Sequence, residues 1–426
     1  MSNSLAPEAV ERLERANHAA TNHVPHQRER RQPPNDAWAP RQVSVNTNGT
    51  SASVRYLPMN VEIEPGGELP QAWLDDWVEL IESSDRWSSP FWRPELITTM
   101  ARIRPAIQVA RLVDSGGRPF GFFPFENCRG VGEPAGGVSS DLHGVIGERG
   151  LSRRDTLHLL NQCGLKTFRF HHMPDDQTGF AESMYFRDVA YQVDLRGGWL
   201  AYQADLKSRG SRLIKRVRQR RGRIERDLGE VRLLESHSPD DLRRMVGWKQ
   251  RMCERKGWRN LYATATSQTL YSELMLRKTE SLRGRLLFLY AGETPVAGLY
   301  LLQSYRSWHA WNVAFAPEAA RYSTGLIAFL DLMRNAHAWG LETLELSRGE
   351  ERFKAELGNR LSYVCEGQTG GSALGIGLRR AWLRGKRTVL GSRYGETARR
   401  WFRWSRRMGQ RALRLGRPFS GATPLT

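Results

Sequence analysis

The sequence predicts a mixed α+β fold in which mostly antiparallel strands form a sheet covered by helices. Residues 286–315 contain three apolar or alternating segments separated by short turns, the pattern of an antiparallel meander. Apolar residues from Leu326 to Met333 then recur at helical spacing. A similar order of helix, strand, hairpin turn and strand begins near Arg86. We therefore expect two tandem domains of the same kind, each a mixed sheet flanked by helices.

The upstream elements follow from the same kinds of pattern. Helices are expected at 69–83, 94–102, 151–164, 199–226, 239–257 and 267–283. Strands are expected at 54–64, 107–113, 119–125, 167–171, 184–195 and 231–234. Residues 130–137 are rich in glycine but lack the spacing of a dinucleotide-binding turn, so we expect a connecting loop there.

Composition suggests two compact domains with a tail at each end. The 426 residues include 40% hydrophobic residues and 14 Trp, enough for two cores. We expect a disordered tail at 1–52, an N-terminal domain at 53–198, a C-terminal domain at 199–367 and a basic, aromatic tail at 368–426. The first of these segments is too polar to bury a core.

Charge and cysteine content limit the partners and the compartment. The formal net charge is +19, which favours anionic partners such as membrane surfaces, nucleic acids, acidic polysaccharides or coenzyme phosphates. The four cysteines show no paired spacing, so free thiols are expected and neither a zinc site nor a disulfide framework. No segment has the apolar length of a signal peptide core or a membrane helix. We expect a cytoplasmic protein, with the inner membrane face as an alternative location.

The segment that leads into the helix after the meander could hold a phosphate group. Ser323, Thr324 and Gly325 are small, and the first turn of a helix offers unpaired N–H groups and a partial positive charge. Arg321 adds a formal charge. The alternative is that Ser323 or Thr324 only caps the helix.

This stretch, RYSTGLIAFLDLMRNAHAWGLETLELSRGEERFKAELG, resembles the acyl-CoA-binding core of the GNAT acyltransferases. It looks more narrowly like the CelD/BcsL-like (cellulose-biosynthesis) branch, which is similar in fold to the FemAB aminoacyltransferases. The upstream segments SSPFWRPE, GFFPF and SSDLHGVI also resemble that branch, so the similarity covers roughly residues 86–367. The common R/Q-x-x-G-x-G/A turn of GNAT enzymes is not present, because only Gly325 follows Arg321.

The resemblance implies acetyl-CoA or another acyl-CoA as co-substrate and no metal. In this family the third strand of the meander is splayed, that is, separated from its neighbour. Its backbone would bind the pantetheine arm, and the turn after it would bind the pyrophosphate. The strand residues are Asn312, Val313, Ala314 and Phe315, and the turn residues are Arg321, Tyr322, Ser323, Thr324, Gly325 and Leu326.

Five residues of the core are candidates for chemistry: His309, Arg348, Glu350, Glu351 and Lys354. His309 shares a strand face with Trp311 and Val313, and a histidine titrating near neutrality suits proton transfer, although a core histidine is the alternative. Arg348, Glu351 and Lys354 follow the last strand of the core, and Lys354 matches the lysine of the family's G-x-x-x-[YF]-K pattern. These cations could fix an anionic group; alternatively Glu351 and Lys354 form a surface ion pair.

Asp141 and His143 are candidates for substrate binding. They lie two residues apart, so on a strand they would face the same side and could form a polar pair. The resemblance places this stretch near a cleft between the domains. The alternative is an Asp that binds its own loop and a His in a satisfied pocket.

Two basic segments each allow more than one functional interpretation. The cations of the 199–226 helix could line the cleft, form a solvated face or bind RNA, and we favour the first two over nucleic-acid binding. The tail from 368 interleaves arginines with aromatic residues, which suits either an anionic membrane surface or packing across the domains.

The function expected is transfer of an acyl group, with acetyl as the first candidate, from coenzyme A to a sugar, a polysaccharide precursor or a lipid-linked amine or hydroxyl in cell-envelope or exopolysaccharide biosynthesis. One alternative is a FemAB-like aminoacyltransferase that takes its donor from charged tRNA. The other is a non-catalytic, membrane-associated accessory protein of exopolysaccharide synthesis.

Overall fold

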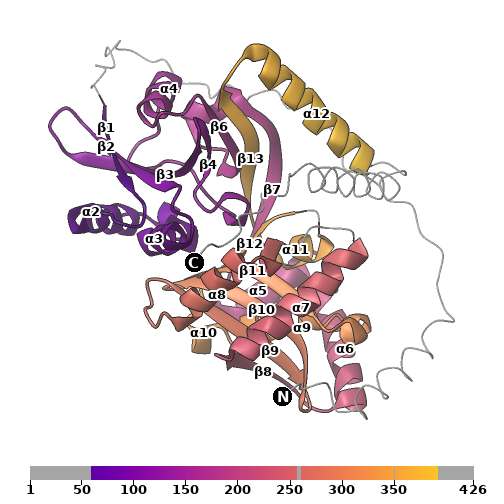
Figure 1. The fold of residues 1–426 in the computed structure, drawn as a ribbon. Coiled ribbons are helices and arrows are strands. Elements are labelled where there is room, and N and C mark those ends of the chain that lie inside the picture. Colours follow the sequence, from indigo (N-terminus) through magenta and orange to yellow (C-terminus); the bar gives the residue numbers. More distant parts are fainter. Residues whose placement is uncertain (1–58, 257–260, 350, 392–426) are drawn as a thin grey trace, which may run out of the picture.

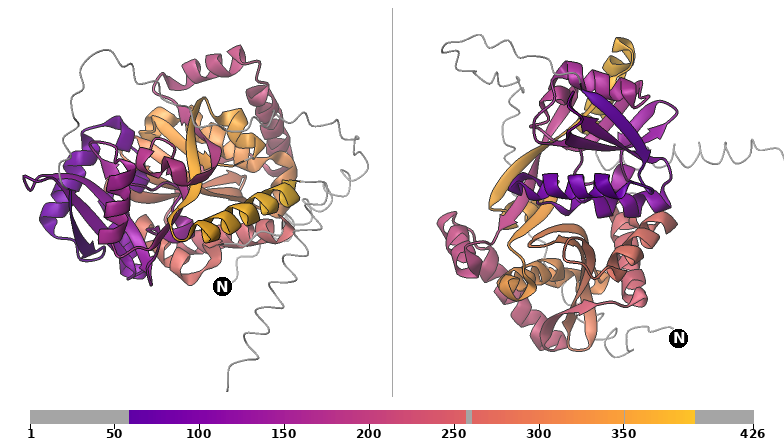
Figure 2. Two further views of the ribbon diagram at one scale, coloured as in Figure 1. Left: turned by 90° about the horizontal axis from the view of Figure 1, so that it is seen from above. Right: turned by 90° about the vertical axis from the view of Figure 1, so that its left-hand side faces the viewer.

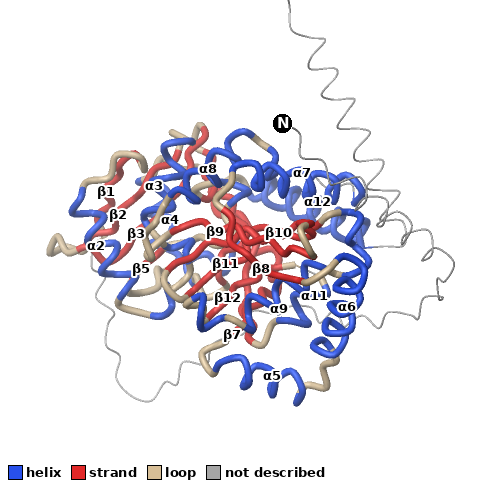
Figure 3. The backbone as a smooth tube through the Cα atoms, turned by 90° about the horizontal axis from the view of Figure 1, so that it is seen from below, coloured by secondary structure: helices blue, strands red, loops and turns tan. Residues whose placement is uncertain are grey.

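A computed structural model describes residues 59–256, 261–349 and 351–391. The expected disordered tail at 1–52 and most of the expected basic tail lie outside these residues. The fold is mixed α+β, as predicted, with one 13-stranded sheet and helices packed against it (Figure 1, Figure 2). Figure 3 shows the strands in the interior and the helices around them.

The first half of the sheet is an antiparallel meander followed by one parallel strand. The strands β1 (Asn60–Pro65), β2 (Ile107–Val113), β3 (Pro119–Cys128) and β4 (Val131–Pro134) pair in sequence order. β6 (Thr167–Pro174) lies parallel to β4, and the short β5 (Ile146–Gly147) pairs with β3. Its helices are α2 (Gln71–Glu82), α3 (Pro94–Ile103) and α4 (Arg153–Gln162).

The second half repeats this arrangement. The strands β8 (Val231–Ser236), β9 (Arg283–Ala291), β10 (Thr294–Ser304) and β11 (Ser307–Phe315) pair in order, and β12 (Thr343–Arg348) lies parallel to β11. Its helices are α7 (Pro239–Lys256), α8 (Ala265–Leu276), α9 (Thr324–Arg334), α10 (Ala336–Trp339) and α11 (Arg352–Leu357). The meander and the helix after it were therefore predicted correctly.

Each half places its last strand in the other half. β7 (Met184–Asp194) follows β6 in the chain but pairs with β12 and β13, while β13 (Arg360–Gly370) pairs with β6 and β7. The sheet order is therefore β1-β2-β3-β4-β6-β13-β7-β12-β11-β10-β9-β8. Figure 1 shows these two long strands between the halves. Backbone hydrogen bonds thus join the halves into one sheet, and β13 extends beyond the boundary expected at 367.

The glycine-rich segment at 130–137 contains a strand, so the loop prediction was wrong there. A Cβ atom at Gly132 would lie 2.7 Å from a Leu165 side-chain atom and 2.8 Å from a Phe168 side-chain atom. Only glycine allows β4 to pass this close to its neighbours. Glycine here signals tight packing of a short strand, which composition alone does not distinguish from a loop.

The basic segment between the halves forms two helices, α5 (Gly198–Ser208) and α6 (Leu213–Leu228), where one was predicted. Gly210 lies between them with a φ of +70°, a left-handed conformation that favours glycine and ends the first helix. The predicted apolar face of α6 is buried through Leu213, Val217 and Ile224. α6 packs beside α9 in the second half, where Arg221 Nη1 lies 2.6 Å from Asp331 Oδ2.

The larger of two hydrophobic cores runs across both halves. Trp77 of α2 stacks on Phe122 of β3 with ring centroids 4.8 Å apart. Arg277 of the second half donates to the Thr99 hydroxyl on α3 at 2.8 Å. All four cysteines are free thiols, as predicted. No helix among the described residues is long and apolar enough to cross a membrane.

Candidate functional site

Strands β11 and β12 separate in the middle of the second half. They pair only where Ser307, Trp308 and His309 face Thr343, Leu344 and Glu345. Beyond this point β12 continues along β7, while β11 continues along β10 to Phe315. The edge of β11 from 310 to 315 therefore lacks a sheet partner on the β12 side among the described residues. The splayed strand expected at 312–315 lies here.

A β-bulge controls which side chains of β11 share a face. Leu301 is opposite Ala310 and Tyr300 is opposite Asn312, so Trp311 is the extra residue. Trp311 still contacts the same side as His309, because Phe91 packs edge-on against both rings. Val313 lies on the other face, beside Gly325 at the start of α9. The prediction that His309, Trp311 and Val313 share one face was thus wrong for Val313.

Polar side chains also gather on the α7 side of β11. Lys249 Nζ donates to the Val313 carbonyl at 3.2 Å and lies 5.2 Å from the Tyr262 ring centroid. Burial lowers the pKa of the Lys249 ammonium. Asn312 is only 2% exposed, and neither polar atom of its side chain has a hydrogen-bond partner among the described residues. A buried amide without partners is costly unless a ligand or water completes it.

The N-terminus of α9 is open, so the capping alternative does not hold. Ser323 occupies the N-cap position with a φ of +55°, and its side chain makes no capping hydrogen bond. Its hydroxyl instead accepts from the Arg220 guanidinium of α6. Thr324 donates to the Val296 carbonyl at 3.2 Å. The Leu326 N–H donates to the Ser323 carbonyl at 2.9 Å, whereas the N–H groups of Thr324 and Gly325 have no partner among the described residues and remain available to an anion.

Arg321 is less available than predicted. Its guanidinium donates to the Tyr322 hydroxyl and lies 3.5 Å from Asp227 Oδ2. The cation that reaches the turn is Arg220, which the sequence placed on a basic helix far from the turn. Helix α4, at the corresponding place in the first half, is closed, because Ser152 and Asp155 form a capping box. Of these two corresponding turns, the one in the second half is open.

His309 forms a bridge between two carboxylates from different elements. Its Nδ1 lies 2.9 Å from Glu345 Oε2 on β12, and its Nε2 lies 3.2 Å from Asp141 Oδ2 in the first half. Ser89 Oγ donates to the same Glu345 oxygen at 2.7 Å. The imidazole is 1% exposed. Both ring nitrogens are therefore engaged, as an imidazolium between two acceptors requires.

The electrostatics of this bridge differ from the prediction. Burial opposes the charged imidazole, but the hydrogen bonds with Asp141 and Glu345 prevail and raise the pKa of His309 to about 9. The bond to His309 likewise holds the pKa of the Asp141 carboxyl well below its ordinary value, against the effect of burial. His309 thus holds its proton at neutral pH and does not titrate near neutrality as predicted. It cannot accept a proton until it loses this one.

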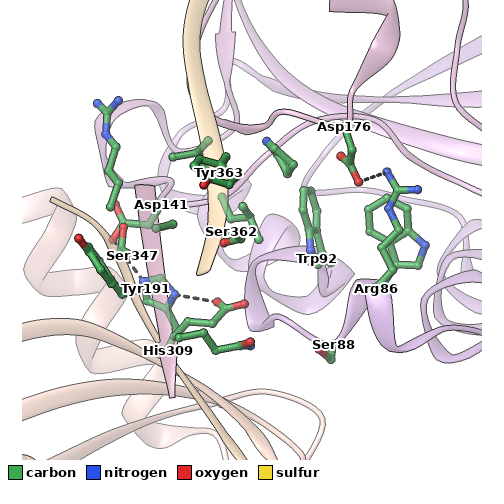
Figure 4. Close-up of a pocket in the computed structure, with 18 of the residues that line it drawn as sticks. Arg86, Ser88, Trp92, Asp141, Asp176, Tyr191, His309, Ser347, Ser362 and Tyr363 are labelled. Atoms are coloured by element: carbon green, nitrogen blue, oxygen red, sulfur yellow. Dashed lines mark hydrogen bonds and ion pairs between the residues drawn. The ribbon is translucent and has the colours of Figure 1, made fainter. Parts of the chain in front are cut away.

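The bridge lines a pocket of about 230 Å³ between the halves. Figure 4 shows His309 between its two carboxylates on one side and Trp92, Arg86 and Asp176 on the other. Arg86 and Asp176 form an ion pair at 2.8 Å across this wall. Aromatic side chains contribute much of the lining, namely Trp87, Trp92, Tyr191 and Tyr363. A second pocket of about 470 Å³ continues from it and shares Asp85, Trp87, Ser88 and Gln192.

The other predicted site residues lie around this pocket with differing roles. Arg348 lines the pocket and pairs with Asp188 at 2.9 Å. Lys354 Nζ donates to the Arg348 carbonyl at 2.5 Å and lies 3.4 Å from Glu351 Oε2, so the predicted ion pair exists on a largely buried lysine. Glu350, another candidate, lies outside the described residues.

Asp141 and His143 do not form the predicted polar pair. They lie on a loop after the short helix η3 (Gly137–Ser139), where the period of a strand does not apply. Asp141 reaches His309, whereas the buried His143 binds the carbonyl oxygen of His171 on β6. The two side chains thus contact different elements although they are close in sequence. Of the two, Asp141 lines the pocket and His143 does not.

Sequence reasoning missed several residues of the site. Glu345 sits in an alternating strand and gives no local signal. Lys249 and Tyr262 come from α7 and η5 (Leu261–Ala263), whose distance from β11 in sequence hides their contact. Ser89, Phe91 and Trp92 lie within SSPFWRPE, a segment whose resemblance to the family was noted without assigning roles. No local pattern in that segment indicates its contacts with Glu345 and His309.

Comparisons with known proteins found one matching family model and several similar solved structures. Residues 211–355 match the family model described as an acetyltransferase (GNAT) domain. No curated protein matches the chain. The chain is similar to the C-terminal domain of a putative lysylphosphatidylglycerol synthetase from Agrobacterium fabrum, with 13% identity over 75% of this chain and 98% of that chain and a TM-score of 0.44.

Two further solved structures show the same level of similarity. A tandem GNAT protein from the clavulanic acid biosynthesis pathway has 12% identity over 74% of this chain and 100% of that chain, with a TM-score of 0.45. FemX has 9% identity over 71% of this chain and 96% of that chain, with a TM-score of 0.47. The matched domain contains the separated strands, the open turn of α9 and His309.

Proposed function

We propose that this chain is an acyl-CoA-dependent acyltransferase whose donor binds in the second half and whose acceptor enters the pocket between the halves. One observation carries the proposal: β11 and β12 separate immediately after His309 and Glu345, the residues that also line the pocket. A thioester placed between the separated strands would therefore have its carbonyl group near the acceptor pocket. The match of residues 211–355 to a GNAT domain supports a donor of this class.

The donor would use the open turn and the free edge of β11. The first-turn N–H groups of α9 and the Arg220 guanidinium offer a cationic site for the pyrophosphate. The backbone of this edge of β11, where Lys249 already donates to the Val313 carbonyl, would bind the pantetheine amides, as the family resemblance implies. Gly325 presents no side chain to the ligand, and a Cβ atom there would make only ordinary contact, 3.5 Å from a Val313 side-chain atom.

The acceptor would be oriented by the carboxylates of the bridge. Its amine or hydroxyl donates to a carboxylate oxygen and attacks the thioester carbonyl, a new C–N or C–O bond forms, and the C–S bond breaks. The attacking atom becomes positively charged and then loses its proton to the carboxylate, and the thiolate leaves and is protonated in turn. The hydrogen bonds to the His309 imidazolium fix the direction of both carboxylates.

The pocket favours a sugar or a related polyol as acceptor. The C–H face of a sugar ring packs on aromatic rings such as Trp92 and Tyr363, while its hydroxyls can bind Asp141, Glu345 and Asp176. The second pocket provides space for a further unit of a longer acceptor. We therefore propose a sugar, a polysaccharide precursor or a lipid-linked glycan as acceptor, with cell-envelope or exopolysaccharide biosynthesis, as in the CelD/BcsL-like branch, as the setting.

The basic helix α6 supports a donor carried on tRNA less than its charge alone suggests. Arg216 pairs with Glu356 at 2.6 Å, Arg221 pairs with Asp331, and Arg220 binds Ser323, so these cations serve the fold and the turn. Release of free thiol from acetyl-CoA distinguishes the two donors directly. A non-catalytic accessory would release none.

The test measures thiol release from acetyl-CoA in the presence of amino sugars, neutral sugars and glycerol. We expect release that depends on one acceptor class and falls at least about a hundredfold in Glu345→Gln, because a positioned acid–base group typically contributes that much. Glu293→Gln, which changes an exposed glutamate that pairs with Arg232, is the matched control and should retain activity. No release with any acyl-CoA, or equal activity in both variants, would contradict the proposal.

A further inference from the structure

Three arginine side chains lie close enough to Tyr185, at the start of β7, for their charges to act on its phenol. Arg169 belongs to β6, whereas Arg379 and Arg380 belong to α12 (Ala373–Gly391), which follows β13 through a turn at 370–372. Burial raises the pKa of Tyr185, and the charges of these three arginines act on it in the opposite direction. All three guanidinium groups are therefore close enough to Tyr185 to influence its charge.

None of the three guanidinium groups forms a hydrogen bond or an ion pair with any residue that the structure describes. The Nε atom of each is buried without a partner, and so is the hydroxyl of Tyr185, a residue only 9% exposed. By contrast, Arg93, a buried arginine among the described residues, pairs with Glu82 and Glu95. Clustered like charges that are partly desolvated repel one another unless an anion compensates them.

The strands bring a further unpartnered polar atom close to Arg169. Gln368 on β13 is opposite Arg169 in the sheet, and its Oε1 atom is buried without a partner among the described residues. The site is separate from the acyl-transfer pocket, because Gln368 lies four residues beyond Val364, the last residue of β13 that lines the pocket, or about 13 Å along the strand. A ligand here need not take part in the transfer itself.

We propose that Arg169, Arg379, Arg380 and Tyr185 form a binding site for a phosphate group, and that its source is the headgroup of an anionic phospholipid. Guanidinium groups bind phosphate oxygens through paired hydrogen bonds, and the phenol supplies one more donor. A carboxylate has fewer oxygen atoms to share among three guanidinium groups and a phenol. A phosphate therefore fits this number of donors better.

The lipid source follows from the residues next to the arginines on α12. Leu378 and Trp382 are one helical turn apart, and 64% and 55% of their surfaces are exposed. Figure 1 shows α12 on the outside of the molecule beside β13. An apolar pair next to phosphate-binding arginines matches the way interfacial helices contact a bilayer, with tryptophan at the headgroup level. A soluble phosphate ester would make no use of this apolar pair.

Vesicle flotation of the full chain tests the proposal. The probes are vesicles of phosphatidylcholine alone and vesicles that also contain phosphatidylglycerol, with inorganic phosphate as a separate ligand in calorimetry. The variants are Arg169→Gln and the double variant Arg379→Gln/Arg380→Gln. The matched control is Arg118→Gln/Arg232→Gln, which also removes two positive charges but from exposed ion pairs elsewhere.

We expect phosphatidylglycerol vesicles to bind the wild-type chain and the control, with at least a tenfold loss in both cluster variants. Binding of inorganic phosphate that depends on the cluster, with no vesicle binding, would support the phosphate site and overturn the lipid source. Vesicle binding reduced equally in the control would show an effect of net charge alone and overturn the site. Unchanged binding of both probes in the cluster variants would also overturn it. Thermal unfolding of each variant separates a lost site from a lost fold.

Discussion

At the level of single residues, His309 links the two halves through its hydrogen bonds. It belongs to β11, yet its partners are Glu345 on β12 and Asp141 in the first half. A buried cation between two carboxylates is stable only while all three groups keep their charges, and removal of one partner leaves an uncompensated charge. The fold and the acceptor pocket therefore depend on the same three side chains.

The stability of this bridge should depend on pH. The folded-state pKa of His309, about 9, lies above its ordinary value of 6.5, so the proton stabilises the folded state. This contribution is fully present below the ordinary value and is lost as the pH rises through about 9. We expect the difference in unfolding free energy between wild type and His309→Gln to shrink by about 3 kcal/mol over that range. Urea unfolding at a series of pH values measures it, and a constant difference would show that His309 is neutral.

The buried Asn312 amide should lower the free energy of unfolding while it contributes to donor binding. Replacing it with leucine removes a buried amide that lacks partners, so we expect the free energy of unfolding to rise by about 1 to 3 kcal/mol. Acyl-CoA turnover should fall, because the amide lies on the strand proposed to hold the donor. Chemical unfolding and thiol release measure the two effects.

Asn359 provides the matched control for this change. Its side chain accepts from the Asp194 amide at 2.7 Å and donates to the Asp194 carbonyl at 3.1 Å, so Asn359→Leu should be destabilising. If Asn312→Leu instead destabilises the protein as much as Asn359→Leu does, then Asn312 is an ordinary structural amide.

The residues that could be predicted from sequence were those with a local signal. His309 and Asp141 were recognised as polar side chains in ordered segments, but their contact joins positions 168 residues apart. Nothing in the spacing of either segment indicates that partner. The charge state of His309 follows from the partners, so its predicted titration near neutrality was wrong for the same reason.

At the scale of elements, the turn before α9 is built by two segments. The local sequence supplies small residues and an uncapped helix start, whereas α6 supplies the cation. Helix packing through Arg221 and Asp331 positions Arg220 over the turn. Sequence reasoning identified the turn but selected Arg321, the nearest arginine, whose guanidinium is held by Asp227 and Tyr322.

Two arginine variants distinguish these roles. Arg220→Gln should weaken acetyl-CoA binding about tenfold, the loss of roughly one charge-assisted contact, while Arg321→Gln should have a smaller effect. Calorimetry of both variants gives the comparison. The reverse order of effects would show that the phosphates bind Arg321 and that the Arg220 contact serves packing.

Element types were predicted more reliably than element partners. The meander from β9 to β11 and helix α9 followed from periodicity, because each is specified by its own residues. The bulge at Trp311 and the glycine-bearing strand β4 were not predicted, because each depends on a neighbour in space. The exchange of β7 and β13 between the halves was not predicted either, because it also depends on neighbours in space.

At the scale of the whole molecule, this exchange makes the halves interdependent. β7 is covalently part of the first half but forms backbone hydrogen bonds with β12 and β13 of the second. A first half produced alone would expose β7 and lack the β13 strand that pairs with β6. The fold is therefore one cooperative sheet, although its two halves repeat one order of elements.

Cutting the chain tests this interdependence. We expect residues 1–196 and 197–426 to be insoluble or unfolded when each is produced alone, and to form a stable complex when produced together. Circular dichroism and gel filtration of the separate and combined fragments make the measurement. Independent folding of either fragment would show that the exchanged strands contribute little.

The measurement that tests the central claim most directly is calorimetric binding of acetyl-CoA and a longer acyl-CoA to the full chain and to Gly325→Glu. A glutamate at that position adds bulk and negative charge to the proposed pyrophosphate site, while the unchanged β-sheet preserves the fold. The account predicts micromolar binding by the wild type and none by the variant. Absence of binding by the folded wild type, or equal binding by both proteins, would contradict it.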